Sequence, residues 1–242
     1  MRVTLAPGHH ATLTDRPLPL TPRFTGTELV VAPYGGPGER ERFLAGTFGS
    51  QDVLWDTPDV LRFRPGDRGL AGVAFAVPEE SAEEGWDPAG VPEAVPGGLR
   101  ADDERDFRLE PATLLCRAPG DAVVAGVRDR EVLTGPLDAR VGIAPGVALL
   151  VRGGEFAGWT LTDPARYLAD DPAPPAPATR ALLTECLDLT TAPLLYAVED
   201  GEPAALARLR EAHETLRARP QDRRRAETLL ALIATLVADF GG

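Results

Sequence analysis

The chain has 242 residues, 43% hydrophobic and 26% charged, which is the balance of a soluble globular protein with room for one large domain or two ordinary ones. Its formal net charge of −12 disfavours general nucleic-acid binding and suits a cytoplasmic protein that binds basic partners. It contains no lysine, which excludes Schiff-base chemistry, the lysine of phosphate-binding loops and attachment of biotin or lipoate. The absence of lysine and asparagine is also what a GC-rich bacterial genome would produce.

The region 1–171 consists of short β-type runs separated by Pro-Gly and Gly-Gly turns. This pattern predicts a β-rich domain built as a sandwich or barrel. The predicted strands cover residues 3–5, 10–13, 28–32, 53–55, 60–63, 72–77, 113–116, 122–127, 147–151 and 159–162.

An internal echo lies within this region. Residues 65–73 and 119–127 share the pattern PGDxxxAGV, and an arginine precedes each copy, Arg64 in the first and Arg117 in the second. The echo indicates either a duplicated β unit or two similar hairpins.

Residues 79–106 are predicted to form a long acidic loop, because ten acidic side chains face only two arginines across several prolines and glycines. Such a loop would steer a basic partner, and an aromatic side chain within it would anchor that partner. The residues predicted to bind a partner here are Trp86, Glu83, Glu84, Asp102 and Asp103. The alternative is a solubilising loop whose tryptophan packs back on the sheet.

Residues 172–178 are predicted to be a stiff proline-rich linker, since prolines cannot occupy a helix interior or a central strand. After it, residues 179–242 show helical periodicity and predict a small helical domain that ends in an antiparallel helix hairpin. The last helix has a wide apolar face, which predicts cover on more than one side, by the rest of the chain or by a second subunit in a homo-oligomer.

Arg223, Arg224 and Arg225 fall in the first turn of this last helix, where the helix dipole disfavours cations. Internal carboxylates could offset that cost, or an acidic partner could, so the three arginines are further candidates for partner binding.

Few side chains are suited to catalysis. Serine and cysteine each occur only twice, without a nucleophile motif, and both cysteines are expected to be buried free thiols. Asp52, Asp56 and Asp59 are the tightest carboxylate group outside the acidic loop, and they would carry a small carboxylate-based enzyme, for example a hydrolase dependent on a divalent metal. His9 and His10 are a weak metal candidate, because neighbours on a strand point to opposite faces.

These observations predict a cytoplasmic protein-interaction module, either an immunity-type inhibitor or an adaptor, that has no cofactor. The N-terminal residues show no signal-peptide pattern, and the longest apolar run, 229–237, is too short to span a membrane. The carboxylate enzyme is the alternative function.

Overall fold

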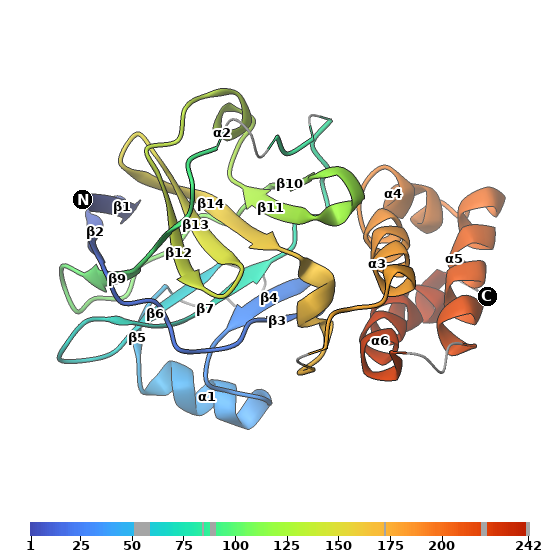
Figure 1. The fold of residues 1–242 in the computed structure, drawn as a ribbon, viewed down its shortest axis with the longest axis horizontal. Coiled ribbons are helices and arrows are strands. Elements are labelled where there is room, and N and C mark those ends of the chain that lie inside the picture. The colour runs from blue at the N-terminus through green and yellow to red at the C-terminus, as the bar shows by residue number, and fades with distance from the viewer. Residues whose placement is uncertain (51–58, 84, 88–90, 172, 219–221, 241–242) are drawn as a thin grey trace.

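The computed structural model describes residues 1–50, 59–83, 85–87, 91–171, 173–218 and 222–240. It confirms the predicted α+β class: a sheet curled into a half-barrel and a second sheet are followed by C-terminal helices (Figure 1). In the described parts of the chain, no helix is long and apolar enough to cross a membrane.

Among the described residues the half-barrel has nine strands, and β14 is its branch point. The order is β8-β12-β13-β14-β1-β2-β9, while β11 also pairs with β14 and carries β10 beside it. Gly158 lies at the branch with a φ of 151°, and a Cβ there would overlap the carbonyl oxygen of Gly126. The strands are β1 (Arg2–Ala6), β2 (His9–Thr14), β8 (Val95–Pro96), β9 (Gly98–Ala101), β10 (Leu114–Arg117), β11 (Val123–Val127), β12 (Ala139–Ala144), β13 (Val147–Arg152) and β14 (Glu155–Thr162).

The second sheet is antiparallel throughout, in the order β3-β4-β7-β6-β5. Its strands are β3 (Arg23–Phe24), β4 (Glu28–Val31), β5 (Phe48–Gly49), β6 (Val60–Phe63) and β7 (Leu70–Ala76). The two sheets face each other, because the Phe75 ring stacks on Phe156 and Trp159 of β14 with centroids 6.2 and 5.8 Å apart. Large apolar side chains from both sheets therefore form the main core.

Four helices pack at one end of the sheets: α3 (Pro177–Leu189), α4 (Leu194–Glu199), α5 (Pro203–Arg217) and α6 (Arg223–Phe240). Both α3 and α5 begin at a proline, whose fixed φ suits the first turn. Helix α6 is covered by α5, by α3 and by the short helix η3 (Pro164–Leu168), and its apolar side chains join the main core. The chain itself thus provides the cover predicted for α6 on more than one side.

Several elements differ from the prediction, and the short elements β3, β5, α2 (Glu131–Thr134) and η3 were not predicted. Helix α1 (Pro37–Ala45) was not predicted, because it has no apolar stripe and buries none of its side chains. Strand β12 was also missed. The acidic segment 79–106 is not one loop, since it contains β8 and β9, and Leu99 and Ala101 of β9 are buried. The predicted strand 53–55 lies outside the described residues. The boundary at 172–178 stays a prediction.

Both copies of the PGDxxxAGV echo form the turns of antiparallel hairpins, β6–β7 and β10–β11. The first copy turns at Gly66, with a φ of 83°, and the second at Gly120, with a φ of 64°. In each hairpin the preceding arginine pairs with the aspartate of the turn: Arg64 with Asp67 at 3.0 Å, and Arg117 with Asp121 at 2.6 Å. The shared pattern therefore forms the same kind of hairpin turn, with the same Arg–Asp ion pair, at both places in the chain.

Candidate functional site

The first part of the acidic segment runs between β10 and the turn that joins α3 to α4. Toward the sheet, the Leu115 amide donates to the Glu80 carbonyl at 2.7 Å, and the Ala82 amide donates to the Leu115 carbonyl at 2.9 Å. Toward the helices, the Ala192 amide donates to the Glu79 carbonyl at 2.7 Å. These bonds hold the segment in place where it helps to line two cavities.

One cavity, here called the loop–helix groove, has a volume of about 840 Å³, within the range of ligand-binding pockets. Its apolar surface comes mainly from Ala82 of the acidic segment and from the turn before α4 and the start of that helix, and charged side chains from the acidic segment, α3 and α5 surround that surface. It is lined by Ser81, Ala82, Glu83, Gly85, Leu115, Arg117, Asp188, Thr191, Ala192, Pro193, Leu194, Tyr196, Ala197, Asp200, Glu202 and Arg208.

Arg117 connects the sheet to α3 within this groove. Its Nε and Nη2 donate to both carboxylate oxygens of Asp121 at 2.6 and 2.9 Å, and its Nη1 donates to Asp188 at 2.6 Å. The Asp121 side chain is 4% exposed and also accepts a hydrogen bond from the Thr184 hydroxyl. Burial alone would lower the pKa of Arg117, but the hydrogen bonds and charges of Asp121 and Asp188 outweigh burial and raise that pKa.

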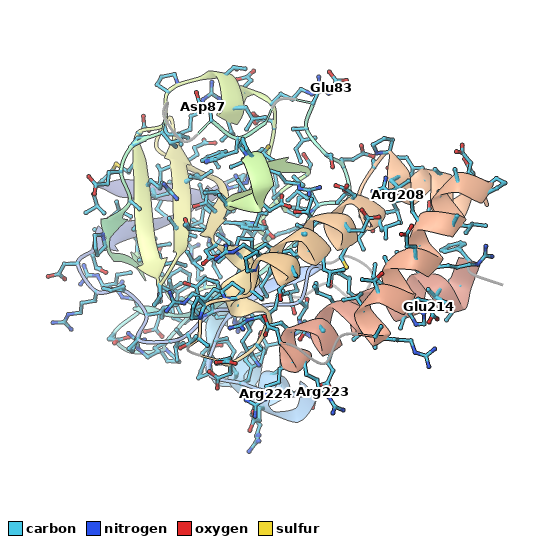
Figure 2. All side chains as sticks on the ribbon, turned by 45° about the vertical axis from the view of Figure 1, so that its right-hand side comes forward. Glu83, Asp87, Arg208, Glu214, Arg223 and Arg224 are labelled. Carbon is cyan, nitrogen blue, oxygen red and sulfur yellow. The ribbon has the colours of Figure 1, made fainter. Side chains whose placement is uncertain are left out.

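A second arginine extends the network to α5. Arg208 donates to Glu185 at 3.0 and 2.8 Å and to Asp188 at 3.4 Å, so Asp188 is shared between the two arginines. The hydrogen bonds that Arg208 donates to Glu185 raise the pKa of Arg208. Figure 2 shows Arg208 on the helices, with Glu83 of the acidic segment above it. Both arginines of the groove are therefore neutralised by the protein's own carboxylates.

Three other carboxylates of the groove have no such partner. Glu83, Asp200 and Glu202 are exposed, and none of them makes an ion pair or a side-chain hydrogen bond with any residue that the structure describes. Tyr196 stands among the groove residues with 43% of its surface exposed, and its hydroxyl donates to Glu80. The groove thus combines an apolar floor, an exposed aromatic ring and uncompensated negative charge, which suits a basic ligand.

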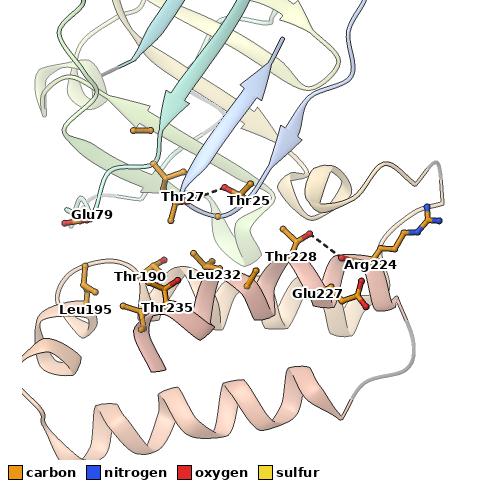
Figure 3. Close-up of a pocket in the computed structure, with 15 residues that line it drawn as sticks. Thr25, Thr27, Glu79, Thr190, Leu195, Arg224, Glu227, Thr228, Leu232 and Thr235 are labelled. Carbon is orange, nitrogen blue, oxygen red and sulfur yellow. Dashed lines mark hydrogen bonds between the residues drawn. The ribbon is translucent and has the colours of Figure 1, made fainter. Parts of the chain in front are cut away.

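The other cavity, here called the sheet–helix cavity, has a volume of about 860 Å³ and lies between the β3–β4 turn and α6 (Figure 3). Gly26 in that turn has a φ of 93°, a conformation that favours glycine, and a Cβ there would crowd the end of the Leu232 side chain of α6. The cavity is lined by Thr25, Gly26, Thr27, Ala76, Val77, Glu79, Thr190, Leu195, Arg224, Glu227, Thr228, Ala231, Leu232, Thr235 and Leu236.

The three predicted arginines of α6 have different surroundings. Arg223 pairs with Glu227 at 2.7 Å, and both side chains are exposed. Arg225 is buried, pairs with Asp222 at 2.8 Å and donates to the Asp171 and Ala173 carbonyls on both sides of residue 172. Internal carboxylates thus offset the helix dipole for these two. Arg224 contacts no carboxylate of the described chain and lines the sheet–helix cavity.

The residues predicted to bind a partner in the acidic segment are not all together. Trp86 is 5% exposed and packs on the half-barrel with Cys116 and Leu150, so its side chain faces the protein's own core. Glu83 is exposed at the groove, and Glu84 lies outside the described residues.

Asp102 and Asp103 follow β9, which lies at the opposite end of the half-barrel from the helices (Figure 1). Asp102 accepts from Arg2 at 2.7 Å and from the Thr12 hydroxyl at 3.1 Å, and Asp103 pairs with Arg105 at 3.0 Å. These two acids therefore belong to a surface separate from the groove.

Of the predicted carboxylate group, the structure describes only Asp59; Asp52 and Asp56 lie outside the described residues. The Asp59 side chain is buried and accepts the amides of Ala76 at 3.2 Å and Ala112 at 2.9 Å. Burial raises its pKa to about 7, and the two amides reduce that shift. Asp59 therefore ties β7 to the segment before β10 from inside the protein.

His9 and His10 point to opposite faces of β2, as adjacent strand residues must. The His9 ring lies 5.2 Å from that of Phe107, and His10 Nδ1 lies 3.2 Å from the Thr4 hydroxyl. Among the residues that the structure describes, no group of three or more His, Cys, Asp or Glu side chains is placed to hold a metal ion.

The predicted burial of both cysteines is confirmed. Burial raises the pKa of Cys186 to about 12, which keeps the thiol protonated at neutral pH. The Ser50 hydroxyl is buried between the Asp59 carbonyl, to which it donates at 3.3 Å, and the Leu61 amide, from which it accepts at 2.8 Å. These side chains support the fold.

Apart from Glu83, the residues that shape the loop–helix groove were not predicted from the sequence. Arg117 and Asp188 are 71 positions apart, and Arg208 reaches Asp188 from another helix, so local patterns do not connect them. One signal was present: the echo places Arg117 before Asp121 in the same way as Arg64 before Asp67. Comparisons of the chain with protein-family models, with curated proteins and with solved structures found no match.

Proposed function

We propose that the protein is a cytoplasmic interaction module that binds a basic segment of a partner protein in the loop–helix groove. Within that class, an immunity-type inhibitor of a basic toxin and an adaptor fit the acidic charge of the chain best. The observation that carries the proposal is the set of three exposed carboxylates, Glu83, Asp200 and Glu202, that the described chain leaves without counter-ions around an apolar floor.

The strength of the interaction follows from its parts. An exposed ion pair contributes about 0.2–1 kcal/mol, so three of them contribute roughly 1–3 kcal/mol, or about fivefold to a hundredfold in affinity. The apolar floor and Tyr196 would add contact area with the stems of lysine or arginine side chains. Because Arg117 and Arg208 are already paired, they would not repel the partner strongly.

A peptide selection tests this proposal with the partner still unidentified. A library of short random peptides is selected against the wild type, against Glu83→Gln/Asp200→Asn/Glu202→Gln, and against a matched control, Asp15→Asn/Glu41→Gln/Glu155→Gln, whose acids are exposed and do not line the groove.

We expect the wild type and the control to enrich the same peptides rich in lysine and arginine, and the groove variant to lose them. The proposal would be refuted if the groove variant enriched the same basic peptides as the wild type, or if the wild type showed no preference for basic peptides.

A further inference from the structure

A third cavity lies on the outer face of the half-barrel and shares no residue with the loop–helix groove. This outer-face pocket has a volume of about 420 Å³ and sits over the β12–β13 hairpin, where residues 17–18 and 94–96 close its sides. It is lined by Pro17, Leu18, Ala94, Pro96, Arg140, Gly142, Ala144, Pro145, Gly146, Val147, Ala148 and Thr162.

Backbone hydrogen bonds fix the sides of the pocket. The Leu18 amide donates to the Ile143 carbonyl at 2.7 Å, and the Gly97 amide donates to the Gly142 carbonyl at 3.0 Å. Gly142, which has no side chain, and Ala148 are paired across β12 and β13 and leave the space above the sheet open. The pocket is thus a built feature of the fold, with mostly apolar walls.

Arg140 is the only charged side chain that lines this pocket within the described chain. It lies on the same face of β12 as Gly142, and its guanidinium contacts the Thr160 hydroxyl at 3.2 Å from Nη2 and 3.4 Å from Nε. Thr160 is fully buried, so this contact comes from within the sheet. The contact uses only part of the fork of donors on the guanidinium.

The two most deeply buried arginines of the described chain each have a counter-ion. Arg62 lies 3.7 Å from Asp106, and Arg225 lies 2.8 Å from Asp222. Arg140 contacts no carboxylate among the described residues, and partial burial alone lowers its pKa. A partly desolvated guanidinium without an anion costs free energy, which a bound carboxylate would offset through two charge-assisted hydrogen bonds.

We propose that the outer-face pocket binds a small carboxylate with a compact apolar body, and that Arg140 holds the carboxylate while the prolines, Leu18 and Val147 enclose the body. The pocket volume fits a ligand of this size. The single cation fits a monoanion better than a phosphate, for which proteins supply several donors. This inference is independent of the proposed partner binding.

Ligand-observed NMR and calorimetry with four probes test the proposal on the intact protein. Benzoate and hexanoate carry the carboxylate and an apolar body, benzamide lacks the charge, and acetate lacks the body. We expect the wild type to bind benzoate or hexanoate at least about tenfold more tightly than benzamide, which lacks the charged hydrogen-bonded group, and than acetate, which lacks the apolar surface to bury. The proposal is overturned if the protein binds neither benzoate nor hexanoate, or if it binds benzamide as tightly as these two carboxylates.

Two variants locate the binding. Arg140→Met removes the charge but keeps an apolar stem, and Gly142→Leu fills the pocket at a position where a Cβ would have only ordinary contacts, at 3.6 Å or more. We expect each to weaken benzoate or hexanoate binding at least about tenfold, with unchanged circular dichroism. Arg152→Met is the control, because Arg152 lies on β13 but pairs with Glu131. This variant should bind benzoate or hexanoate like the wild type. Binding that survives both variants overturns the proposal.

Discussion

Replacing Arg117 by methionine should destabilise the protein strongly, because it leaves a carboxylate buried without its counter-ion. The substitution removes three hydrogen bonds of 2.6–2.9 Å to Asp121 and Asp188, while the Asp121 side chain stays 4% exposed. Breaking such a buried pair costs about 3–5 kcal/mol. Urea unfolding followed by circular dichroism at neutral pH measures this loss as a lower midpoint at constant slope.

A second substitution separates the lost charge pair from lost packing. In the wild type, Asp121→Asn should destabilise, because it removes the negative charge that pairs with Arg117. In the Arg117→Met background the same change should recover about 1–3 kcal/mol, since it removes an uncompensated buried charge. Asparagine also tolerates the φ of 52° at position 121. If Asp121→Asn destabilises both backgrounds equally, the two residues are not coupled and the buried charge pair does not explain the loss.

The protein contains its own control for this experiment. Arg64 and Asp67 form the equivalent pair in the first hairpin of the echo, but their side chains are 51% and 62% exposed. Arg64→Met should therefore cost only about 0–1 kcal/mol. An equal cost for Arg64→Met and Arg117→Met would show that burial does not decide the effect.

Three further predictions concern buried groups. Burial raises the pKa of Asp59 from 3.8 to about 7, so the folded protein holds a proton that the unfolded chain releases, and stability falls as pH rises. Between about pH 5 and pH 8, the free energy of unfolding measured by urea titration should fall about 3 kcal/mol less in Asp59→Asn than in the wild type. An equal fall in both proteins would contradict this prediction. Arg225→Met should cost roughly 3–5 kcal/mol, against under about 0.5 kcal/mol for the exposed Arg223→Met, and equal costs would refute the assignment. Cys186 should react with a thiol reagent only in urea, and fast labelling of the native protein would show that it is not buried.

Local patterns predicted much of the secondary structure. Strand β6 (Val60–Phe63) was predicted with its observed ends, and the helical periodicity of residues 179–242 predicted the antiparallel pair that α5 and α6 form. These elements carry their own signals, because periodicity and capping residues act within a few positions. Helix α1 has no apolar periodicity, since none of its side chains is buried. Strand β9 was missed because the acidic residues around it indicated a loop.

The candidate sites were decided by the tertiary structure. The sequence offered internal carboxylates as partners for the arginines at the start of the last helix, but it could not show which acids and arginines meet, because the loop–helix groove joins residues from β10, α3, α4 and α5. Trp86 illustrates the limit: the sequence left open whether its side chain anchors a partner or packs back on the sheet, and the fold placed it against the half-barrel. Arg140 is a similar case, since the lack of a carboxylate beside it within the described chain is a property of the fold.

The sequence by itself thus determined the α+β class, the negative charge and the chemistries that a chain without lysine cannot perform. These follow from composition and from patterns within single elements. The tertiary structure decided which charges are paired, which described carboxylates are left free at the groove and that Arg140 faces its pocket without a counter-ion from the described chain, because all three depend on contacts between distant segments.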